Sequence, residues 1–240
     1  MPHASSHHIH EHPVEVPAGS LLLSGDLSIP ENPRGVVLFA HGSGSSRHSP
    51  RNRFVAARLH EGSLATLLLD LLTVDEEAED LRTARLRFDI GLLAGRLAHA
   101  TDWLVEFQDT NQLAIGYFGA STGGGAALVA AAERPGPVAA VVSRGGRPDL
   151  AGGALARVRA PTLLIVGGHD QPVIRMNKEA LSALHSEKRL EIVPGATHLF
   201  EEPGALEEVA RLAREWFERY LTSAPEHGAF SYENAEDSRP

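Results

Sequence analysis

The chain has 240 residues, of which 42% are hydrophobic, and its formal net charge is -9. This length and apolar content suffice for one sizeable α/β domain with a real core. The acidic balance argues against nucleic-acid binding, which needs a basic face to neutralise phosphates. The absence of cysteine excludes disulfides, thiolate nucleophiles and cysteine-ligated metals.

Both ends of the sequence are polar. Residues 1–13 contain five histidines, but such a terminal segment is predicted to be a disordered tail without a specific metal site. It lacks the charged start and apolar stretch of a signal peptide, and no apolar run could span a membrane, so a cytoplasmic protein is expected. Residues 223–240 are predicted to be a second solvated tail, which leaves 14–222 as a single domain.

Between the tails, short apolar runs alternate with longer helix-like segments, a pattern typical of a mostly parallel sheet flanked by helices. The runs are continuously apolar, as expected for strands buried on both faces. An earlier pair of runs is predicted to form an antiparallel hairpin at the sheet edge. The hairpin strands are 14–18 and 21–30, and the buried strands are 35–40, 65–71, 113–118, 138–143, 162–168 and 189–193.

Two of the intervening segments carry clear helix signals. Thr73 and Glu76 form a T-x-x-E capping box in front of an acidic helix. Acidic side chains suit the positive end of a helix dipole, so this acidic run is interpreted as architecture. The last helix is predicted over 203–221, with Pro203 in its first turn and an apolar stripe facing the core.

The stretch Gly119-Ala120-Ser121-Thr122-Gly123 matches the G-x-S-x-G pattern between a strand-like run and an alanine-rich, helix-like run. A serine at a sharp strand-to-helix turn needs small residues two positions before and after it, and the two glycines supply them. The helix N-terminus behind it would direct N–H groups at an oxyanion. Phosphate-loop and dinucleotide-binding patterns are absent from this turn. By itself the pattern leaves open a catalytic serine and a purely structural turn.

A serine nucleophile requires an orienting acid and a base, which in one common arrangement follow it in that order along the chain. Asp170 comes just after the strand at 162–168, where side chains converge on the site of an open α/β sheet. Asp149 is the rival acid, although capping a short helix would explain it equally well.

The predicted base is His198, which lies in the loop between the last strand and the final helix. This position favours it over His185, near a helix end, and His227, in the C-terminal tail. His169 would point away if Asp170 points into the site, so it is interpreted as a supporting or structural residue.

The loop after the strand at 35–40 reads His41-Gly42-Ser43-Gly44. Its small residues would let backbone amides approach a tetrahedral intermediate, so the N–H groups of Ser43 and Thr122 are the predicted oxyanion donors. His41 is expected to hold the loop by hydrogen bonding. Gly42 and Gly44 are predicted to line the substrate site.

Five arginines follow strand ends near the predicted site. Arg51 and Arg144 are candidates for binding an anionic group of the substrate through bidentate contacts. The alternative, favoured by the sequence, is that the arginines pair with Asp70 or with Glu76 and Glu77, or stay solvated. The five are Arg47, Arg51, Arg53, Arg144 and Arg147.

The segments "HGSGSSRHSPRNR", "GASTGGGAAL", "PTLLIVGGHDQPV" and "GATHLFEEPGALEEVARLAREWF" resemble the α/β-hydrolase superfamily, in particular its branch related to dienelactone hydrolases. The resemblance covers most of 14–222 and implies an α/β-hydrolase fold with Ser121 as nucleophile, Asp170 as acid and His198 as base. Similar hydrolase domains also occur joined to phosphoribosyltransferase domains, of which this sequence shows none. Dienelactone hydrolases proper use a cysteine nucleophile, so dienelactone is not the predicted substrate.

The predicted function is hydrolysis of small carboxylic esters by a serine hydrolase, without a cofactor or metal. The segment 144–160 is too short for a helical lid domain, so an open site is expected. The alternatives are a hydrolase-fold protein that binds a small ligand without turnover and, within the enzyme class, a thioesterase or an acyltransferase. The sequence predicts neither the natural substrate nor the oligomeric state.

Overall fold

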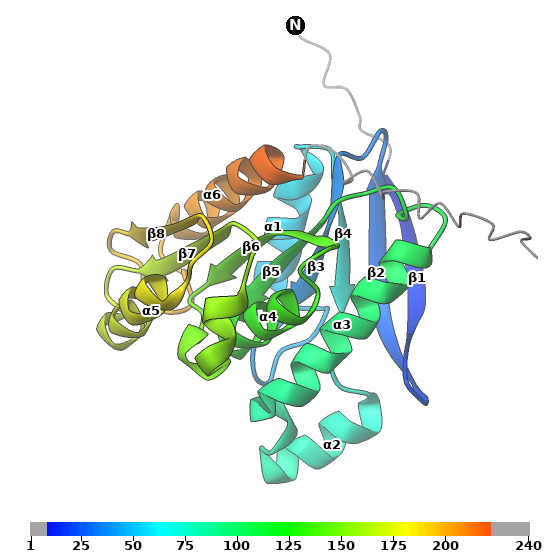
Figure 1. The fold of residues 1–240 in the computed structure, drawn as a ribbon, viewed down its shortest axis with the longest axis horizontal. Coiled ribbons are helices and arrows are strands. Elements are labelled where there is room, and N and C mark those ends of the chain that lie inside the picture. Colours follow the sequence, from blue (N-terminus) through cyan, green and yellow to red (C-terminus); the bar gives the residue numbers. More distant parts are fainter. Residues whose placement is uncertain (1–8, 222–240) are drawn as a thin grey trace, which may run out of the picture.

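The computed structural model describes residues 9–221, and the predicted C-terminal tail lies outside the described residues. It has one eight-stranded sheet in the order β1-β2-β4-β3-β5-β6-β7-β8 (Figure 1). Strand β2 pairs antiparallel with β1 and β4, and all later neighbours are parallel. The strands are β1 (Ile9–Ala18), β2 (Leu21–Pro30), β3 (Gly35–Ala40), β4 (Leu64–Leu69), β5 (Ile115–Ala120), β6 (Val138–Arg144), β7 (Thr162–Gly167) and β8 (Lys188–Val193).

Helices cover both faces of the sheet, as predicted (Figure 1). Helices α1 and α6 pack with one face of the sheet in one apolar cluster, and α3, α4, η2 and part of α5 pack with the other face. No helix in the described part of the chain is both long and apolar enough to cross a membrane. The helices are α1 (Pro50–His60), α2 (Val74–Thr83), η1 (Leu86–Phe88), α3 (Ile90–Glu106), α4 (Thr122–Glu133), η2 (Pro148–Arg157), α5 (Gln171–Ala183) and α6 (Ala205–Tyr220).

The edge hairpin is longer than predicted, because β1 begins at Ile9. Residues 9–13, assigned from the sequence to a tail, pair in register with residues 26–30 of β2. Most of their side chains are exposed. An edge strand is held by backbone hydrogen bonds, so a polar composition does not exclude it. Of the five terminal histidines, His10 and His12 lie on this strand, and the other three lie outside the described residues.

The final helix begins later than predicted. Helix α6 starts at Ala205, and its N-cap residue Gly204 has a left-handed backbone with φ 81°. This conformation interrupts a helical path and is readily adopted only by glycine. Pro203 therefore precedes the helix and does not form its first turn.

The chain between β6 and β7 contains only η2, so no lid domain is inserted there. Strands β3, β5, β6 and β7 are parallel neighbours, and their carboxyl ends therefore meet at one edge of the sheet. In open α/β sheets this edge is where ligands bind. Every residue predicted to act chemically follows one of these strands or β8.

Candidate active site

Ser121 occupies a sharp turn between β5, which ends at Ala120, and α4, which begins at Thr122. Its backbone has φ 51° and ψ -121°, an unusual conformation for a residue with a side chain. Such a conformation costs on the order of 1–3 kcal/mol and persists only where the surrounding structure enforces it. The turn therefore has the form of the strained nucleophile elbow that the G-x-S-x-G pattern predicts.

The two glycines of the pattern allow the close packing around this turn. A Cβ atom at Gly123 would lie 2.2 Å from the carbonyl oxygen of Ala40, at the end of β3. A Cβ atom at Gly119 would lie 2.5 Å from the Cα atom of Gly124. Both positions face backbone atoms that cannot move aside, so only glycine fits, as predicted.

Gly124 and Gly125 let α4 approach the end of β6 and the segment that follows it. A Cβ atom at Gly124 would lie 2.5 Å from Ser143 Oγ, and one at Gly125 would lie 2.7 Å from the Arg147 carbonyl oxygen. Each glycine costs a helix about 1 kcal/mol relative to alanine. Close contact between α4 and the start of η2 explains why this cost is tolerated, which the sequence did not reveal.

The predicted base and acid form a hydrogen-bonded pair. The Nδ1 atom of His198 lies 2.6 Å from Oδ2 of Asp170, which precedes α5. The Asp170 side chain is 13% exposed and that of His198 is 40% exposed. When Nδ1 carries the proton it donates to the carboxylate, which leaves Nε2 as the free nitrogen. The His198 ring also lies beside Gly145, where a Cβ atom would be 3.4 Å from its Cε1.

Ser121 and His198 line one cavity at the carboxyl edge of the sheet. The Ser121 hydroxyl makes no hydrogen bond to the ring in this structure, and such bonds often tighten only when substrate is bound. Predicted residues from three other elements line the same cavity: Gly42, Ser43, Arg51 and Arg144. The sequence did not point to further lining residues, which are Ser45, Ser49, Asn52, Ala120 and Leu199.

The rival acid and bases are engaged elsewhere or lie away from this cavity. Asp149 forms two hydrogen bonds with the Arg147 guanidinium, at 2.9 and 2.7 Å. His185 follows α5 and lines a separate surface hollow beside Pro135. His169 is exposed and does not line this cavity, and His227 lies outside the described residues.

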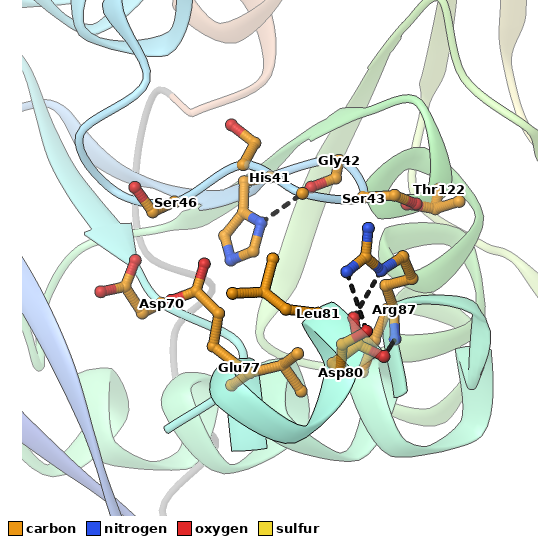
Figure 2. Close-up of a pocket in the computed structure, with 14 residues that line it drawn as sticks. His41, Gly42, Ser43, Ser46, Asp70, Glu77, Asp80, Leu81, Arg87 and Thr122 are labelled. Carbon is orange, nitrogen blue, oxygen red and sulfur yellow. Dashed lines mark hydrogen bonds and ion pairs between the residues drawn. The ribbon is translucent and has the colours of Figure 1, made fainter. Parts of the chain in front are cut away.

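The loop after β3 brings Ser43 next to Thr122, with 3.0 Å between their hydroxyl oxygens (Figure 2). Within residues 9–221, the backbone N–H groups of these two residues donate no hydrogen bond to the protein. Gly42 is pressed against the elbow, because a Cβ atom there would lie 3.1 Å from Ser121 Cβ. Both amides are therefore free to bind an oxyanion.

His41 holds this loop, as expected. Its Nε2 accepts the backbone N–H of Leu71 at 3.1 Å, so Nδ1 carries the proton and donates to the Gly42 carbonyl at 3.0 Å. Desolvation lowers the pKa of the imidazole, which keeps it neutral. The carbonyl and N–H of a trans peptide point in opposite directions. The bond to Gly42, drawn in Figure 2, therefore turns the Ser43 N–H away from the His41 ring.

A second cavity lies on the other side of this loop. Gly44, predicted to line the substrate site, lines this cavity rather than the one that holds Ser121. Helix α2 and η1 form its outer wall through Leu81 and the ion-paired Asp80 and Arg87 (Figure 2). The sequence analysis did not assign this wall to the site. The position of α2 directly after β4, at the carboxyl edge of the sheet, could have indicated it.

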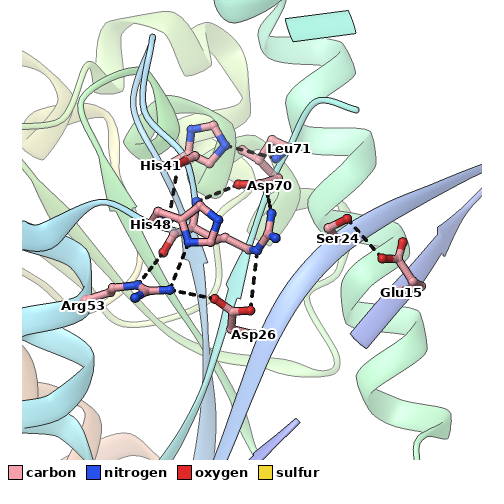
Figure 3. Close-up of polar contacts among 10 residues, drawn as sticks. Glu15, Ser24, Asp26, His41, His48, Arg53, Asp70 and Leu71 are labelled. Atoms are coloured by element: carbon pink, nitrogen blue, oxygen red, sulfur yellow. Dashed lines mark hydrogen bonds and ion pairs between the residues drawn. The ribbon is translucent and has the colours of Figure 1, made fainter. Parts of the chain in front are cut away.

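Most of the arginines near the site have carboxylate partners, but only the Arg47–Asp70 pair is one that the sequence predicted, and among the described residues none of the five pairs with Glu76 or Glu77. Arg47 pairs with Asp70 and Asp26, and Arg53 donates to Asp26 at 3.2 Å (Figure 3). Arg51 pairs with Glu201 at 3.2 Å. Arg144 differs, since its guanidinium has no carboxylate partner among the described residues.

The sequence of residues 25–223 matches the model of the dienelactone hydrolase family. The chain belongs to this family. A dienelactone hydrolase of known structure from Anabaena variabilis is 66% identical, with a TM-score of 0.88, and the match covers 90% of this chain and all of that one. The fold expected from the resemblance is thereby confirmed.

Curated relatives from two Mycobacterium tuberculosis strains are 58% identical over 208 residues. Each is named a "putative phosphoribosyl transferase". The match covers 87% of this chain but 46% of each relative, so the chain spans about half the length of these proteins.

More distant solved structures share the fold alone. Est1E from Butyrivibrio proteoclasticus is 16% identical with a TM-score of 0.71, over 85% of this chain and 97% of that one. A dienelactone hydrolase-like promiscuous phosphotriesterase from metagenomic libraries is 17% identical with a TM-score of 0.73, over 89% of this chain and 99% of that one. The comparisons therefore show the family and its hydrolase fold.

Proposed function

We propose that this member of the family is a serine hydrolase that cleaves small carboxylic esters through an acyl-enzyme. Ser121 attacks the ester carbonyl while His198 takes its proton and passes it to the leaving alcohol. Asp170 holds the imidazole in the required tautomer and stabilises the imidazolium. A water molecule, deprotonated by His198 in the same way, then attacks the acyl-enzyme and releases the carboxylic acid. The observation that carries this proposal is that the strained turn at Ser121 shares one cavity with His198, whose Nδ1 is hydrogen-bonded to Asp170.

The two unengaged amides of Ser43 and Thr122 complete the proposed machinery. Preorganised N–H donors stabilise the charge that develops on the carbonyl oxygen, and they need no rearrangement during the reaction. His41 contributes indirectly, because it fixes the peptide that carries the Ser43 N–H. The chain has no cysteine, so the cysteine chemistry of dienelactone hydrolases proper is replaced by serine chemistry.

Replacement of the proposed nucleophile is the direct test. We expect Ser121→Ala to lower kcat for p-nitrophenyl acetate by roughly 10³-fold or more, because no other group supplies the attacking oxygen. The matched control Ser182→Ala alters a serine on α5 whose hydroxyl bonds only the Lys178 carbonyl, and it should keep full activity. Full activity in purified Ser121→Ala would overturn the assignment.

Labelling with a fluorophosphonate probe separates the enzyme from a binding protein with the same fold. Stoichiometric labelling that is lost in Ser121→Ala supports the hydrolase, and no labelling of the folded wild type supports the binding protein. Rates on matched esters and thioesters, with and without an added alcohol acceptor, then separate an esterase from a thioesterase or acyltransferase. Phosphoribosyl transfer, the activity in the names of the curated relatives, is not proposed. The segment that this chain shares with those relatives consists mainly of the hydrolase family domain.

A further inference from the structure

Arg144 is a buried cation at the centre of the candidate site. It is the last residue of β6, and its carbonyl oxygen accepts the backbone N–H of Ser121 at 3.2 Å. The residue is 8% exposed, and it lines the cavity that contains Ser121 and His198. The next residue, Gly145, lies beside the His198 ring, since a Cβ atom there would be 3.4 Å from Cε1. Arg144 therefore lies between the proposed nucleophile and the proposed base.

The described part of the protein does not satisfy the guanidinium of Arg144. Within residues 9–221, its Nε and Nη1 atoms are buried without a hydrogen-bond partner. The charge of Arg51 repels it, and the ring of Phe200 lies 5.8 Å from its Cζ atom. Burial and the charge of Arg51 lower the pKa of Arg144 to about 10, so the group remains charged at neutral pH.

Unpaired polar atoms gather around this cavity. Arg51 Nε and Asn52 Oδ1 are also buried without hydrogen-bond partners, and both residues line the cavity together with Arg144. By contrast, Arg147 lies three residues beyond Arg144 and is neutralised by a bidentate contact with Asp149. A buried charge without a partner is strongly unfavourable in a folded protein, so a ligand is the natural source of the missing anion.

The shape of the site indicates which part of an ester carries this anion. The leaving alcohol must lie next to the imidazole that protonates it. His198 lines the same cavity as Arg144, whereas neither residue lines the second cavity beyond Ser43. An anionic group near Arg144 therefore belongs to the alcohol portion of the substrate rather than to the acyl portion.

We propose that Arg144, supported by Arg51 and Asn52, binds a carboxylate or phosphate on the alcohol portion of the ester, and that this contact determines substrate specificity. The inference rests on the proposed function. In the reaction, water and the ester yield a free carboxylic acid and an anionic hydroxy compound, with the leaving oxygen protonated by His198. The planar guanidinium suits such an anion because it offers parallel N–H donors.

The test compares four small esters on the wild-type protein. Butyryloxyacetate carries its charge on the alcohol side, butyryloxyacetamide is its neutral counterpart, and monoethyl succinate is an isomer with the charge on the acyl side. The fourth, 2-butyryloxyethyl phosphate, distinguishes a phosphate from a carboxylate. We expect kcat/KM for at least one of the two alcohol-side anions to exceed that of butyryloxyacetamide and of monoethyl succinate by about 10- to 100-fold.

Two variants assign the preference to Arg144. In Arg144→Gln the ratio of anionic to neutral kcat/KM should fall to about one, and Arg144→Lys, which keeps the charge without the planar fork, should recover part of it. The matched control Arg147→Gln removes an arginine that already has a partner, so it should keep the wild-type ratio. In the wild type, glycolate should inhibit butyryloxyacetamide hydrolysis more strongly than ethylene glycol does, and this readout needs no variant.

Each contrary result has a distinct meaning. If the wild type hydrolyses the neutral ester but prefers neither alcohol-side anion, the anion subsite is wrong and the hydrolase stands. A preference that survives in folded Arg144→Gln also overturns the role of Arg144. A preference for monoethyl succinate overturns the placement on the alcohol side. Failure of every ester, together with absent fluorophosphonate labelling, overturns the proposed function itself.

Discussion

The elbow around Ser121 and the segment formed by α2 and η1 both adjoin the loop after β3, but different forces hold them. Helix α4 buries nine of its 12 residues, and its first turn touches neighbouring backbone directly. Helix α2 has one buried residue among 10, namely Asp80, and Leu81 on its surface is 72% exposed. The elbow is positioned by steric contact, whereas the outer wall is positioned by charges and caps.

This difference matters for what each region can tolerate. Close packing against backbone allows no added atom, because protein interiors are as dense as organic crystals. Ion pairs allow small displacements, and they depend on pH. The part of the site that orients the proposed nucleophile is therefore rigid, and the wall of the second cavity is the part that conditions can loosen.

The largest expected effect on stability is at Gly123, and it tests whether steric contact positions the elbow. We expect Gly123→Ala to lower the free energy of unfolding by about 3 kcal/mol or more, because the added Cβ meets the Ala40 carbonyl at 2.2 Å. The matched control is Gly95→Ala in α3, where a Cβ atom has nothing within 4 Å. That change should stabilise the protein by roughly 0.5–1 kcal/mol. Urea unfolding measures both, and a Gly123→Ala protein of wild-type stability would contradict steric control of the elbow.

An intermediate effect is expected where α2 is anchored. The Arg96 side chain is 7% exposed and pairs with Glu76 at 2.7 Å, so Glu76→Gln leaves a buried charge without its carboxylate. We expect a loss of about 1–3 kcal/mol in the free energy of unfolding, less than for a fully buried pair because Glu76 is partly exposed.

Glu79→Gln is the matched control for this change, since Glu79 is exposed on the same helix and has no side-chain partner among the described residues. It should change stability by less than about 0.5 kcal/mol. Urea unfolding measures the stability of both variants. Equal free energies of unfolding for Glu76→Gln and Glu79→Gln would show that the ion pair does not anchor α2.

The smallest effect is a local response to acid. Burial alone would raise the pKa of the Glu76 carboxyl, but hydrogen bonds from Arg96 and Thr73 hold it below its usual value. The Asp80 carboxyl is likewise lowered, because Arg87 and two backbone N–H groups outweigh its desolvation. A carboxyl whose folded-state pKa is depressed stabilises the fold above its unfolded pKa of about 4, and this stabilisation is lost as the pH falls through the folded value.

The α2–η1 segment should therefore lose amide protection before α4 does when the pH is lowered from 7 to 3. Hydrogen exchange at matched intrinsic rates measures this order. Loss of protection in both helices at one pH would mean that the outer wall is no more dependent on charge than the elbow.

Much of the fold followed from local signals. Continuous apolar runs predicted the parallel strands because a sheet covered on both faces needs them. The capping box of Thr73 and Glu76 marked the start of α2, and both of its hydrogen bonds are present. Two predicted boundaries were wrong. The start of β1 depends on pairing with β2, and the start of α6 depends on the left-handed backbone of Gly204, so that Pro203 precedes the helix. The assignment of the triad remains a prediction that the proposed labelling tests.

The sequence by itself determined the order of the elements, the glycine-flanked serine, and the residue types available for chemistry. Only the tertiary structure decided which arginine lacks a partner. Arg47, Arg51, Arg53 and Arg147 pair with carboxylates, three of which are distant in the sequence, whereas Arg144 has no carboxylate partner within residues 9–221. Charge pairing depends on which side chains meet after the strands assemble, so spacing along the chain cannot distinguish a neutralised arginine from a buried, unpaired one.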